Sequence, residues 1–480
     1  MNRFEQLVSF CDSQIRIGRT AEAAKHLSQI RATSVPRKWR LPLAKLARRT
    51  GLYSLGLKLL AKLVRGEQAQ ACSPGELAEY GVLLIRIGAV NEGLATLKKV
   101  DTEEAPEALL FGAFGHFGQW EFLEAIPQLE KYLTLKLTPY ERLVGQANLA
   151  FAQVECRRHE EASRLLSQLI EQTQTEGHLQ LEGNCHALQA QIFLQENRLA
   201  LAKEQLGFAQ GLFARSNVND HFLVTKLDLI VEALGQGKTS PLEELRRSAR
   251  TRQDWVALRE ADFFALQIRF NNEPAQRLVF GTPYVNFRNR VREQFGAQMP
   301  VENSFILGDK STPALDLMQL GESIKSGSKC HQVVEVLLRD FYEPSRVAGL
   351  HSALFPDEYY DVNSSPARVR QLVRRTREWF ASEKLPLSIL VQNGFYSLAL
   401  NGNLAIRLEL TRRPLDTSAV RLQHLGSRFQ GTSFSNAQAS RCLGLSRTVT
   451  QSLLNTGVEN GKVERLGHSK RKTLYRLSAA

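Results

Sequence analysis

The sequence has few cysteines and no long apolar run. Its six cysteines are far apart, and no CxxC pair or Cys/His spacing typical of a metal site occurs. We therefore expect reduced thiols, no metal and no cofactor. No stretch of about 18 apolar residues is present, so no membrane-spanning helix is predicted. The N-terminal MNRFEQLVSFCDSQIRIG carries Glu5 and Asp12 and lacks the apolar core of a signal peptide. These features predict a cytoplasmic protein with no membrane partner.

Common catalytic signatures are also missing. The sequence contains no HExxH and no GxSxG, and isolated histidines such as His116, His186 and His221 lie in helical segments. GQGKTS at Gly235–Ser240 resembles the end of a phosphate-binding loop, but Glu232 stands where that loop needs glycine. The preceding LDLIVEAL has helical spacing, which favours a helix end capped by glycine. We predict that the chain is not an enzyme.

The positive charge is concentrated near the C-terminus. The chain has 480 residues and a formal net charge of +13. Residues 401–480 contain 13 Lys and Arg against 4 Asp and Glu, a balance of +9, whereas residues 301–400 contain 11 against 12. A basic segment that keeps regular apolar positions indicates a folded module with a polyanionic partner.

The N-terminal half repeats itself. Segments such as RIGRTAEAAKHLSQI from Arg16 and CRRHEEASRLLSQLI from Cys156 share a helix end, a short turn and a second amphipathic helix. Each repeat has a small or apolar residue at one aligned position, and these residues are Ala23, Gly56, Gly93, Leu123, Ala162 and Ala202. Successive members of this set are 33, 37, 30, 39 and 40 positions apart. Such a period predicts stacked helical hairpins, whose helices cross closely at the small residue.

This pattern resembles a degenerate tetratricopeptide repeat over residues 1–235. The resemblance implies a concave surface that binds a peptide, a protein or a small molecule. Residues 236–302 continue as a helical extension or cap. The predicted fold class is mainly α, with an N-terminal helical-hairpin repeat solenoid followed by two α+β winged-helix domains.

The residue pattern changes after residue 300. SFILGD and ALDLMQL alternate as strands, three helical segments follow, and Asn393-Gly394 marks a hairpin turn. This order, over residues 303–400 of a predicted domain 303–412, resembles the winged-helix output domain of OmpR/PhoB-type regulators. Its third helix would be the recognition helix. Arg370, Arg374 and Arg377 share one face there, and arginines suit phosphates and guanine edges. A solvated arginine face is the alternative.

The last segment predicts a second helix-turn-helix. FSNAQASRCLGLSRTVTQSLL divides into two short helices at Gly444, with Ser435 or Asn436 capping the first. Val449 and Leu453 would pack inward. KVERL and TLYRL then alternate as strands around the basic turn GHSKRK. This order resembles MarR-type winged-helix domains over residues 425–478 of a predicted domain 420–480.

The resemblance assigns roles to named residues. The recognition helix would present Arg447, Thr448, Thr450 and Gln451 to base edges in the major groove, and Ser446 to a phosphate. Lys470, Arg471 and Lys472 at the wing tip would lie along the DNA backbone or enter the minor groove, and phosphate contacts there would give salt-sensitive affinity. Docking to a protein is the alternative use of such a module.

Two functions follow from these patterns. The first is a DNA-binding transcriptional regulator of the bacterial type. Its helical repeats would sense a peptide, protein or small-molecule effector, and its winged helices would bind double-stranded DNA. A homodimer fits this class, since such regulators usually bind paired half-sites. The alternative is a non-catalytic scaffold in which the repeats and the winged helices all dock proteins.

Overall fold

The computed structural model describes most of the chain. The described residues are 3–65, 72–216, 222–299, 304–316, 328–409, 422, 425–426, 428–429, 431–443, 447–469 and 472–477. They form two compact units. The first comprises residues 1–301, 336–371 and 389–398, and the second comprises residues 302–335, 372–388 and 399–480.

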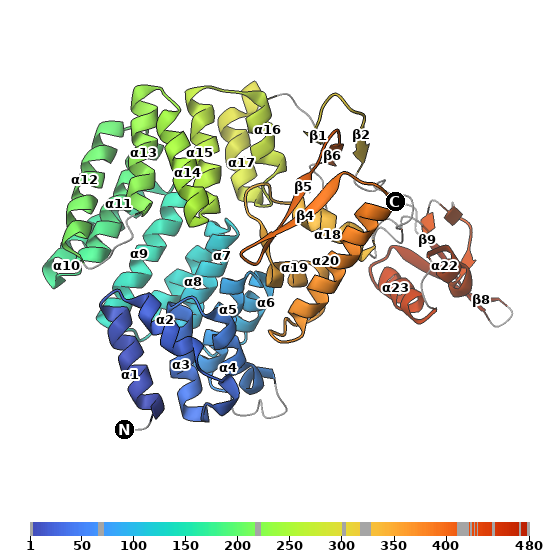
Figure 1. Ribbon diagram of the computed structural model, residues 1–480, viewed down its shortest axis with the longest axis horizontal. Helices are drawn as coiled ribbons and strands as arrows, with labels where there is room; N and C mark the ends of the chain where they lie inside the picture. Colours follow the sequence, from blue (N-terminus) through green and yellow to red (C-terminus); the bar gives the residue numbers. More distant parts are fainter. Residues whose placement is uncertain are drawn as a thin grey trace. The chain divides into compact units, whose positions relative to one another are not determined.

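Successive helices of the first unit pair as hairpins that stack side by side (Figure 1). The paired helices are α1 (Arg3–Arg16) and α2 (Thr20–Ser28), α3 (Arg37–Arg49) and α4 (Tyr53–Arg65), α5 (Pro74–Ile87) and α6 (Val90–Leu97), α7 (Glu107–Gly118) and α8 (Phe122–Thr134), α9 (Pro139–Glu155) and α10 (His159–Glu176), α11 (Leu179–Gln195) and α12 (Leu199–Arg215), α13 (Phe222–Gln236) and α14 (Ser240–Arg252), and α15 (Trp255–Ile268) and α16 (Asn272–Phe280). Helix α17 (Val285–Phe295) follows. The predicted helical repeats are thus confirmed, and helical hairpins continue beyond residue 235.

A small residue stands at the fourth position of the second helix in each of these hairpins except α13–α14, where Glu243 takes this place. A Cβ atom on Gly93 would lie 2.6 Å from Ile85 Cγ1 and 2.7 Å from the carbonyl oxygen of Gly81, so the backbones of α5 and α6 nearly touch. In α8 this position is Ala125, which is fully buried, whereas Leu123 is 55% exposed. The alignment of Leu123 with the other small residues is therefore wrong. The helix α8 begins at Phe122, so the repeat position falls two residues later.

The turns within the hairpins use a residue in the left-handed conformation. Gly88 between α5 and α6 has φ +99°, and the same place between later helices is taken by Arg157 and Asn197, with φ near +60°. A side chain in this conformation costs roughly 1–2 kcal/mol, which the packed helices on either side must offset. Gly237, with φ +63°, ends the turn after α13. GQGKTS is accordingly a helix end, as predicted.

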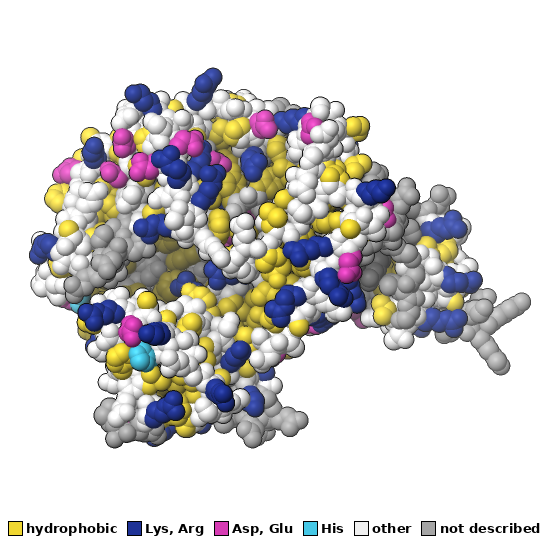
Figure 2. All heavy atoms as spheres, in the orientation of Figure 1, with side chains coloured by type: hydrophobic (Ala, Val, Ile, Leu, Met, Phe, Trp, Pro, Cys, Tyr) yellow, Lys and Arg dark blue, Asp and Glu magenta, His cyan; other side chains and the backbone are white. Residues whose placement is uncertain are grey.

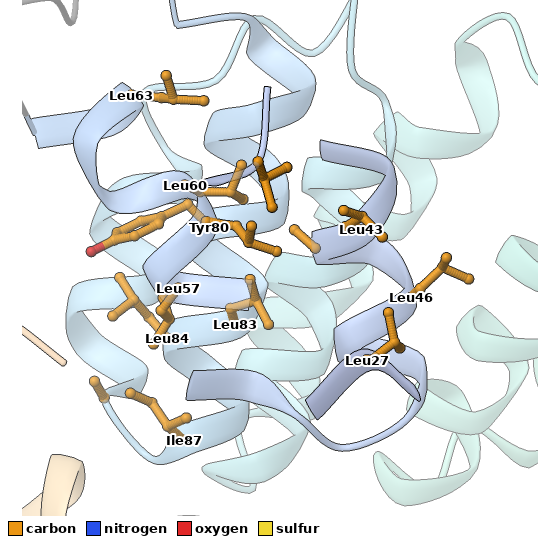
Figure 3. Close-up of a cluster of buried hydrophobic side chains, with 14 of the residues drawn as sticks. Leu27, Leu43, Leu46, Leu57, Leu60, Leu63, Tyr80, Leu83, Leu84 and Ile87 are labelled. Carbon is orange, nitrogen blue, oxygen red and sulfur yellow. The ribbon is translucent and has the colours of Figure 1, made fainter. Parts of the chain in front are cut away.

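Leucines from the first hairpins form a continuous core (Figure 3). Leu27, Leu43, Leu57 and Leu83 come from four different helices, and each is 2% exposed or less. Burying a leucine side chain stabilises the fold by about 1.5–3 kcal/mol. The same cluster includes Tyr360, which comes from much later in the sequence but belongs to the same compact unit.

Residues 329–400, here called the central module, alternate helices and strands. They comprise α18 (Lys329–Leu337), β3 (Ser345–Arg346), α19 (Val347–Leu354), α20 (Ser365–Ser382), β4 (Leu387–Gln392) and β5 (Phe395–Leu400). The strand order is β3-β5-β4. Asn393 and Gly394 have φ +51° and +80°, which confirms the hairpin turn between β4 and β5.

A buried polar cluster anchors residues 340–343 on α15. The guanidinium of Arg259 is fully buried, forms an ion pair with Asp340 and lies 4.9 Å from the ring centroid of Tyr284. The Tyr342 hydroxyl donates a hydrogen bond of 2.6 Å to Asp262. Breaking a buried pair of this kind costs about 3–5 kcal/mol. This part of the central module is therefore packed firmly against the helical hairpins.

Two further small sheets belong to the second unit. Strands β1 (Ser304–Gly308), β2 (Ala314–Asp316) and β6 (Ala405–Glu409) form a sheet of order β1-β6-β2, in which β1 is antiparallel and β2 parallel to β6. The strand predicted at SFILGD is confirmed. The strand predicted at ALDLMQL is confirmed over its first residues, and the rest lies outside the described residues.

Residues 434–477, here called the C-terminal module, have their own core. They comprise β7 (Phe434–Ser435), α22 (Asn436–Leu443), α23 (Arg447–Glu459), β8 (Val463–Ser469) and β9 (Lys472–Leu477), with strand order β7-β9-β8. Phe434, Leu454 and Tyr475 are 1% exposed or less and pack together. The Ser435 hydroxyl accepts from the Gln438 amide, and the Gln438 side chain accepts from the Ser435 amide, so Ser435 caps α22 as predicted.

Candidate functional site

The first unit contains a cavity of about 520 Å³ lined by alternate helices of the stack. Side chains of α9, α11, α13 and α15 form most of the wall. Figure 2 shows the molecule hollowed between α13–α15 and α1–α2, with hydrophobic side chains in the hollow. We call this cavity the repeat groove. Its size is that of a site for a small ligand or a short peptide segment.

One wall of the repeat groove is aromatic. The Phe151 ring meets the Phe117 ring edge to face at 5.1 Å and the Phe122 ring at 5.6 Å. Tyr140 is 54% exposed beside them. Aromatic rings supply large contact areas at a low entropy cost, and each well-placed ring pair adds about 0.5–1.5 kcal/mol. This wall can therefore bind apolar side chains of a ligand.

Charged groups lie at the bottom of the groove. Lys226 Nζ is 2.6 Å from Glu260 Oε2, and both side chains are largely buried. Burial opposes the charge of Lys226, but the Glu260 carboxylate outweighs this effect and raises the pKa of the lysine. Burial raises the pKa of the Glu155 carboxyl, while Arg290, 3.4 Å away, opposes that shift. The floor thus offers paired charges rather than a single free one.

Side-chain amides provide polar contacts along the groove. Asn148 Nδ2 donates to the Val144 carbonyl oxygen at 2.8 Å, which leaves its Oδ1 to accept. Within the described part of the chain, Asn184 and Gln180 make no hydrogen bond, although both line the groove. An amide that both donates and accepts matches the backbone of an extended peptide. The sequence predicted a concave binding surface but named none of these residues, because nothing in the repeat pattern marks them.

The helix α23 carries the residues predicted to read DNA. Arg447 and Thr448 are exposed in its first turn. Thr450 is fully buried among the core residues of the C-terminal module, so its hydroxyl does not reach the surface. Val449 is 47% exposed, which corrects the expectation that it packs inward. The buried stripe of α23 runs through Thr450, Leu453 and Leu454, one position later than the apolar spacing suggested.

Gln451 belongs to a hydrogen-bond network within the C-terminal module. Its Nε2 donates to the Tyr475 hydroxyl at 2.7 Å and to Asn455 Oδ1 at 2.9 Å. Its Oε1 accepts from Asn436 Nδ2 at 2.8 Å, and Asn436 also donates to the Arg447 carbonyl oxygen at 3.1 Å. These bonds hold α22 and α23 together. Asn436 connects Gln451 to the backbone of Arg447.

Several residues predicted to contact DNA are not described. Ser446, Lys470 and Arg471 lie outside the described residues. Lys472 begins β9, and its side chain is not described. The roles of these four residues stay predictions.

The arginines of α20 share an exposed face. Arg370, Arg374 and Arg377 are exposed, while Val369 and Trp379 are buried on the other side, as the spacing predicted. Arg374 Nε lies 3.6 Å from Glu378 Oε1, and both side chains are well exposed. An exposed pair of this kind contributes about 0–1 kcal/mol and leaves the guanidinium able to change partner.

Among the described residues, no three His, Cys, Asp or Glu side chains come together as a metal site would require. Across the same residues, no helix combines the length and the apolar character that crossing a membrane demands.

Comparisons with known proteins place the chain in no family. No model of a known protein family matches the chain, and no curated protein matches it. The solved structures that resemble it include a tetratricopeptide repeat protein from Parabacteroides merdae, 14% identical over 57% of this chain and 96% of that chain, with a TM-score of 0.36. The apo form of RapI is 11% identical over 62% and 93% of the two chains, with a TM-score of 0.38. The C-terminal part of a repeat protein from Cytophaga hutchinsonii is 14% identical over 57% and 99%, with a TM-score of 0.31. Similarities of this size carry no functional information. The helix pairs themselves define a stack of helical hairpins.

Proposed function

We propose that this chain is a DNA-binding transcriptional regulator that binds a peptide or protein effector in its repeat groove. The observation that carries the proposal is the first turn of α23, where Arg447 and Thr448 are exposed above a small, well-packed core. The C-terminal module has the element order and the strand order β7-β9-β8 of a winged helix-turn-helix. Its part of the chain also holds a charge balance of +9.

The chemistry of the exposed residues suits a DNA groove. The second helix of a helix-turn-helix enters the major groove with its N-terminal end, where an arginine can bind guanine O6 and N7. Arg447 occupies this place on α23. Lys470, Arg471 and Lys472 would contact phosphates, and each such contact adds affinity that falls as salt rises. Ser446 would bind a phosphate. Thr450 has no part in the proposed surface because it is buried.

The central module is proposed as a second region of DNA contact. Its element order and strand order β3-β5-β4 match those of the C-terminal module, and Arg370, Arg374 and Arg377 are exposed on α20. We assign these arginines a supporting role in DNA contact. The proposed domain limits are those predicted from the sequence, 303–412 and 420–480, and the proposed DNA-bound form is a homodimer on paired half-sites.

The repeat groove receives the signal in this proposal. Its aromatic wall and its unpaired amides fit the side chains and the backbone of a peptide. A ligand can shift a conformational equilibrium only by the difference in its affinity for the two states. The effector must therefore bind the DNA-competent state and the other state with different affinities.

DNA selection tests the main claim. The full chain would be incubated with genomic DNA fragments across a salt series, beside the variants Arg447→Ala and Arg476→Ala. Arg476 is a matched control because it is also exposed, lies on β9 and pairs with Glu464 at 2.7 Å. We expect enrichment of particular fragments that Arg447→Ala abolishes and Arg476→Ala preserves. Equal enrichment by all three proteins would refute the role of Arg447.

Peptide selection tests the groove. A displayed peptide library would be panned on the full chain, and the selected peptides measured against Tyr140→Ala, Asn184→Ala and the control Tyr359→Ala. Tyr359 is 69% exposed and does not line the groove. We expect weaker binding to the first two variants alone. Peptides that bind all variants equally would place the partner site elsewhere.

A protein-docking scaffold is the second candidate. It is favoured by the central module, whose Ala348 and Tyr360 pack against the helical hairpins, so this element order already serves protein packing here. The scaffold predicts that the full chain fails to bind DNA even at low salt, where phosphate contacts are strongest.

A further inference from the structure

A second and larger cavity lies in the first unit, away from the repeat groove. Its volume is about 750 Å³. One wall comes from the turn after α2 and the start of α4, and the other comes from β3, α19 and the turn between β4 and β5. All of these segments belong to the same compact unit. We call it the junction cavity.

The charged side chains around the junction cavity are all basic. Arg31, Lys58 and Arg346 line it from three separate elements, and the described lining contains no carboxylate. Within the part of the chain that the structure describes, Arg31 and Lys58 form no ion pair. Arg346 lies 4.8 Å from the Phe395 ring centroid, which fixes its guanidinium at the cavity wall. The Glu343 carboxyl interacts electrostatically with Arg346, so Arg31 and Lys58 are the two lining cations without a counter-charge among the described residues. Unpaired cations that line one cavity raise the local potential, and an anion relieves their repulsion.

The rest of the lining is apolar with a few polar groups. Ile30, Leu52, Leu55 and Val347 supply aliphatic surface. Polar groups come from Tyr53, Ser54 and Asn393, and Gly394 allows close approach of a ligand to the backbone. A volume of about 300–1,000 Å³ with mostly apolar walls and a few charged groups is typical of small-molecule sites.

We propose that the junction cavity binds a small organic anion with an apolar or aromatic body and a phosphate, sulfonate or carboxylate group. The anionic group would lie between Lys58, Arg31 and Arg346, and the body against Leu52 and Val347. A small molecule is favoured over a nucleic-acid strand because the three cations face one concave cavity. The arginine face of α20, by contrast, forms an open stripe.

Occupation of this cavity would connect two parts of the first unit. The ligand would contact α4 on one side and β3 with the Asn393-Gly394 turn on the other. It would therefore stabilise the packing of the central module on the first hairpins in proportion to ligand concentration. The inference goes beyond the proposed function, because it requires neither DNA nor a partner in the repeat groove.

Anilinonaphthalene sulfonate is a suitable probe, because it joins an aromatic body to an anion and fluoresces when bound. The full chain would be titrated with it, and ATP would be added as a competing anion at constant ionic strength. The test variant is Lys58→Gln. The matched control is Lys62→Gln, one turn further along α4, which is exposed but does not line the cavity. Ser54→Glu is a second test variant, since it places a carboxylate in the lining.

We expect saturable probe binding that Lys58→Gln weakens about fivefold or more and Lys62→Gln leaves unchanged. Ser54→Glu should weaken it further, and ATP should displace the probe from the wild-type chain. Equal effects of Lys58→Gln and Lys62→Gln, or probe binding that ATP does not displace, would overturn the proposal. Displacement by a DNA oligonucleotide but not by ATP would also overturn it in favour of a nucleic-acid surface.

Discussion

The central module and the C-terminal module have the same plan and different surroundings. Each has a short strand, two helices and a hairpin, which in the central module follow α18, and in each the first strand pairs with the last. Tyr360 and Ala348 of the central module belong to the leucine core of the first hairpins. Phe434, Leu454 and Tyr475 of the C-terminal module instead pack on one another.

The two parts of the chain that contain these modules also differ in net charge. Residues 301–400 have a balance of −1, and residues 401–480 a balance of +9. A module whose surface is taken up by protein packing gains little from basic residues, whereas a module that contacts a polyanion needs them. One arrangement of helices and strands thus packs on the helical hairpins in the central module and forms a core of its own in the C-terminal module.

The largest expected effect is the loss of stability when a core residue of either module is truncated. Leu454→Ala should cost about 2–5 kcal/mol and lower hydrogen-exchange protection in α22 and α23 only. Tyr360→Ala should lower protection in α3–α5, because this ring packs among their leucines. Hydrogen exchange of the full-length variants, measured by mass spectrometry, would compare the two effects. Loss of protection in α3–α5 after Leu454→Ala would contradict the separate cores.

A smaller effect is expected from removing equal charge from the two modules. Alanines at Lys470, Arg471 and Lys472 should lower the slope of log affinity for DNA against log salt by up to about three. Alanines at Arg370, Arg374 and Arg377 should lower it less, because Arg374 already has Glu378 as a partner. Anisotropy titrations across salt concentrations would measure both slopes. A larger change from the second set would make α20 the main contact.

The stability of the turn before α20 should depend on the Asp361 carboxylate. Asp361 Oδ1 accepts from the amides of Asn363 and Ser364 at 2.9 and 2.8 Å. Burial opposes its charge, but these donors outweigh burial and lower its pKa. Its contribution is therefore present above a pH of about 4 and is lost as the pH falls through the lowered pKa. Asp361→Ala should cost about 1 kcal/mol at neutral pH. Denaturant unfolding should show this difference shrinking in acid.

The smallest effect concerns His351 of α19. The side chain is buried between the rings of Phe355 and Tyr360, and burial lowers its pKa. The folded protein holds it neutral, so its contribution is present above a pH of about 6.5 and is lost as the pH falls below that value. His351→Phe should reduce the fall in melting temperature between pH 7 and pH 5, on the order of 1 kcal/mol in stability. An unchanged pH dependence would contradict this assignment.

Much of the fold could be predicted from local sequence. The hairpin period, the Asn393-Gly394 turn and the helix end at Gly237 each depend on neighbouring residues, and all are confirmed. The assignment of Leu123 failed because α8 begins at Phe122, so that its fourth residue is the buried Ala125. The turn before α8 uses Trp120 in a left-handed conformation, as the later turns use Arg157 and Asn197, and no glycine marks its position. The domain limits at 235, 302, 412 and 420 remain predictions.

The candidate sites were less predictable. The buried stripe of α23 includes Thr450, a polar residue, and this burial depends on tertiary packing that apolar spacing does not encode. The groove residues Asn148 and Asn184 lie on different helices, and only the stacking brings them to one surface. The junction cavity joins residues more than 300 positions apart, such as Arg31 and Arg346.

Hydrogen exchange of the full chain with and without a selected genomic DNA fragment tests the central claim most directly. The account predicts protection in the first turn of α23 and in β8 and β9, with no change in α9 and α11 of the repeat groove. Absence of saturable DNA binding at low salt, or protection confined to the repeat groove, would contradict it.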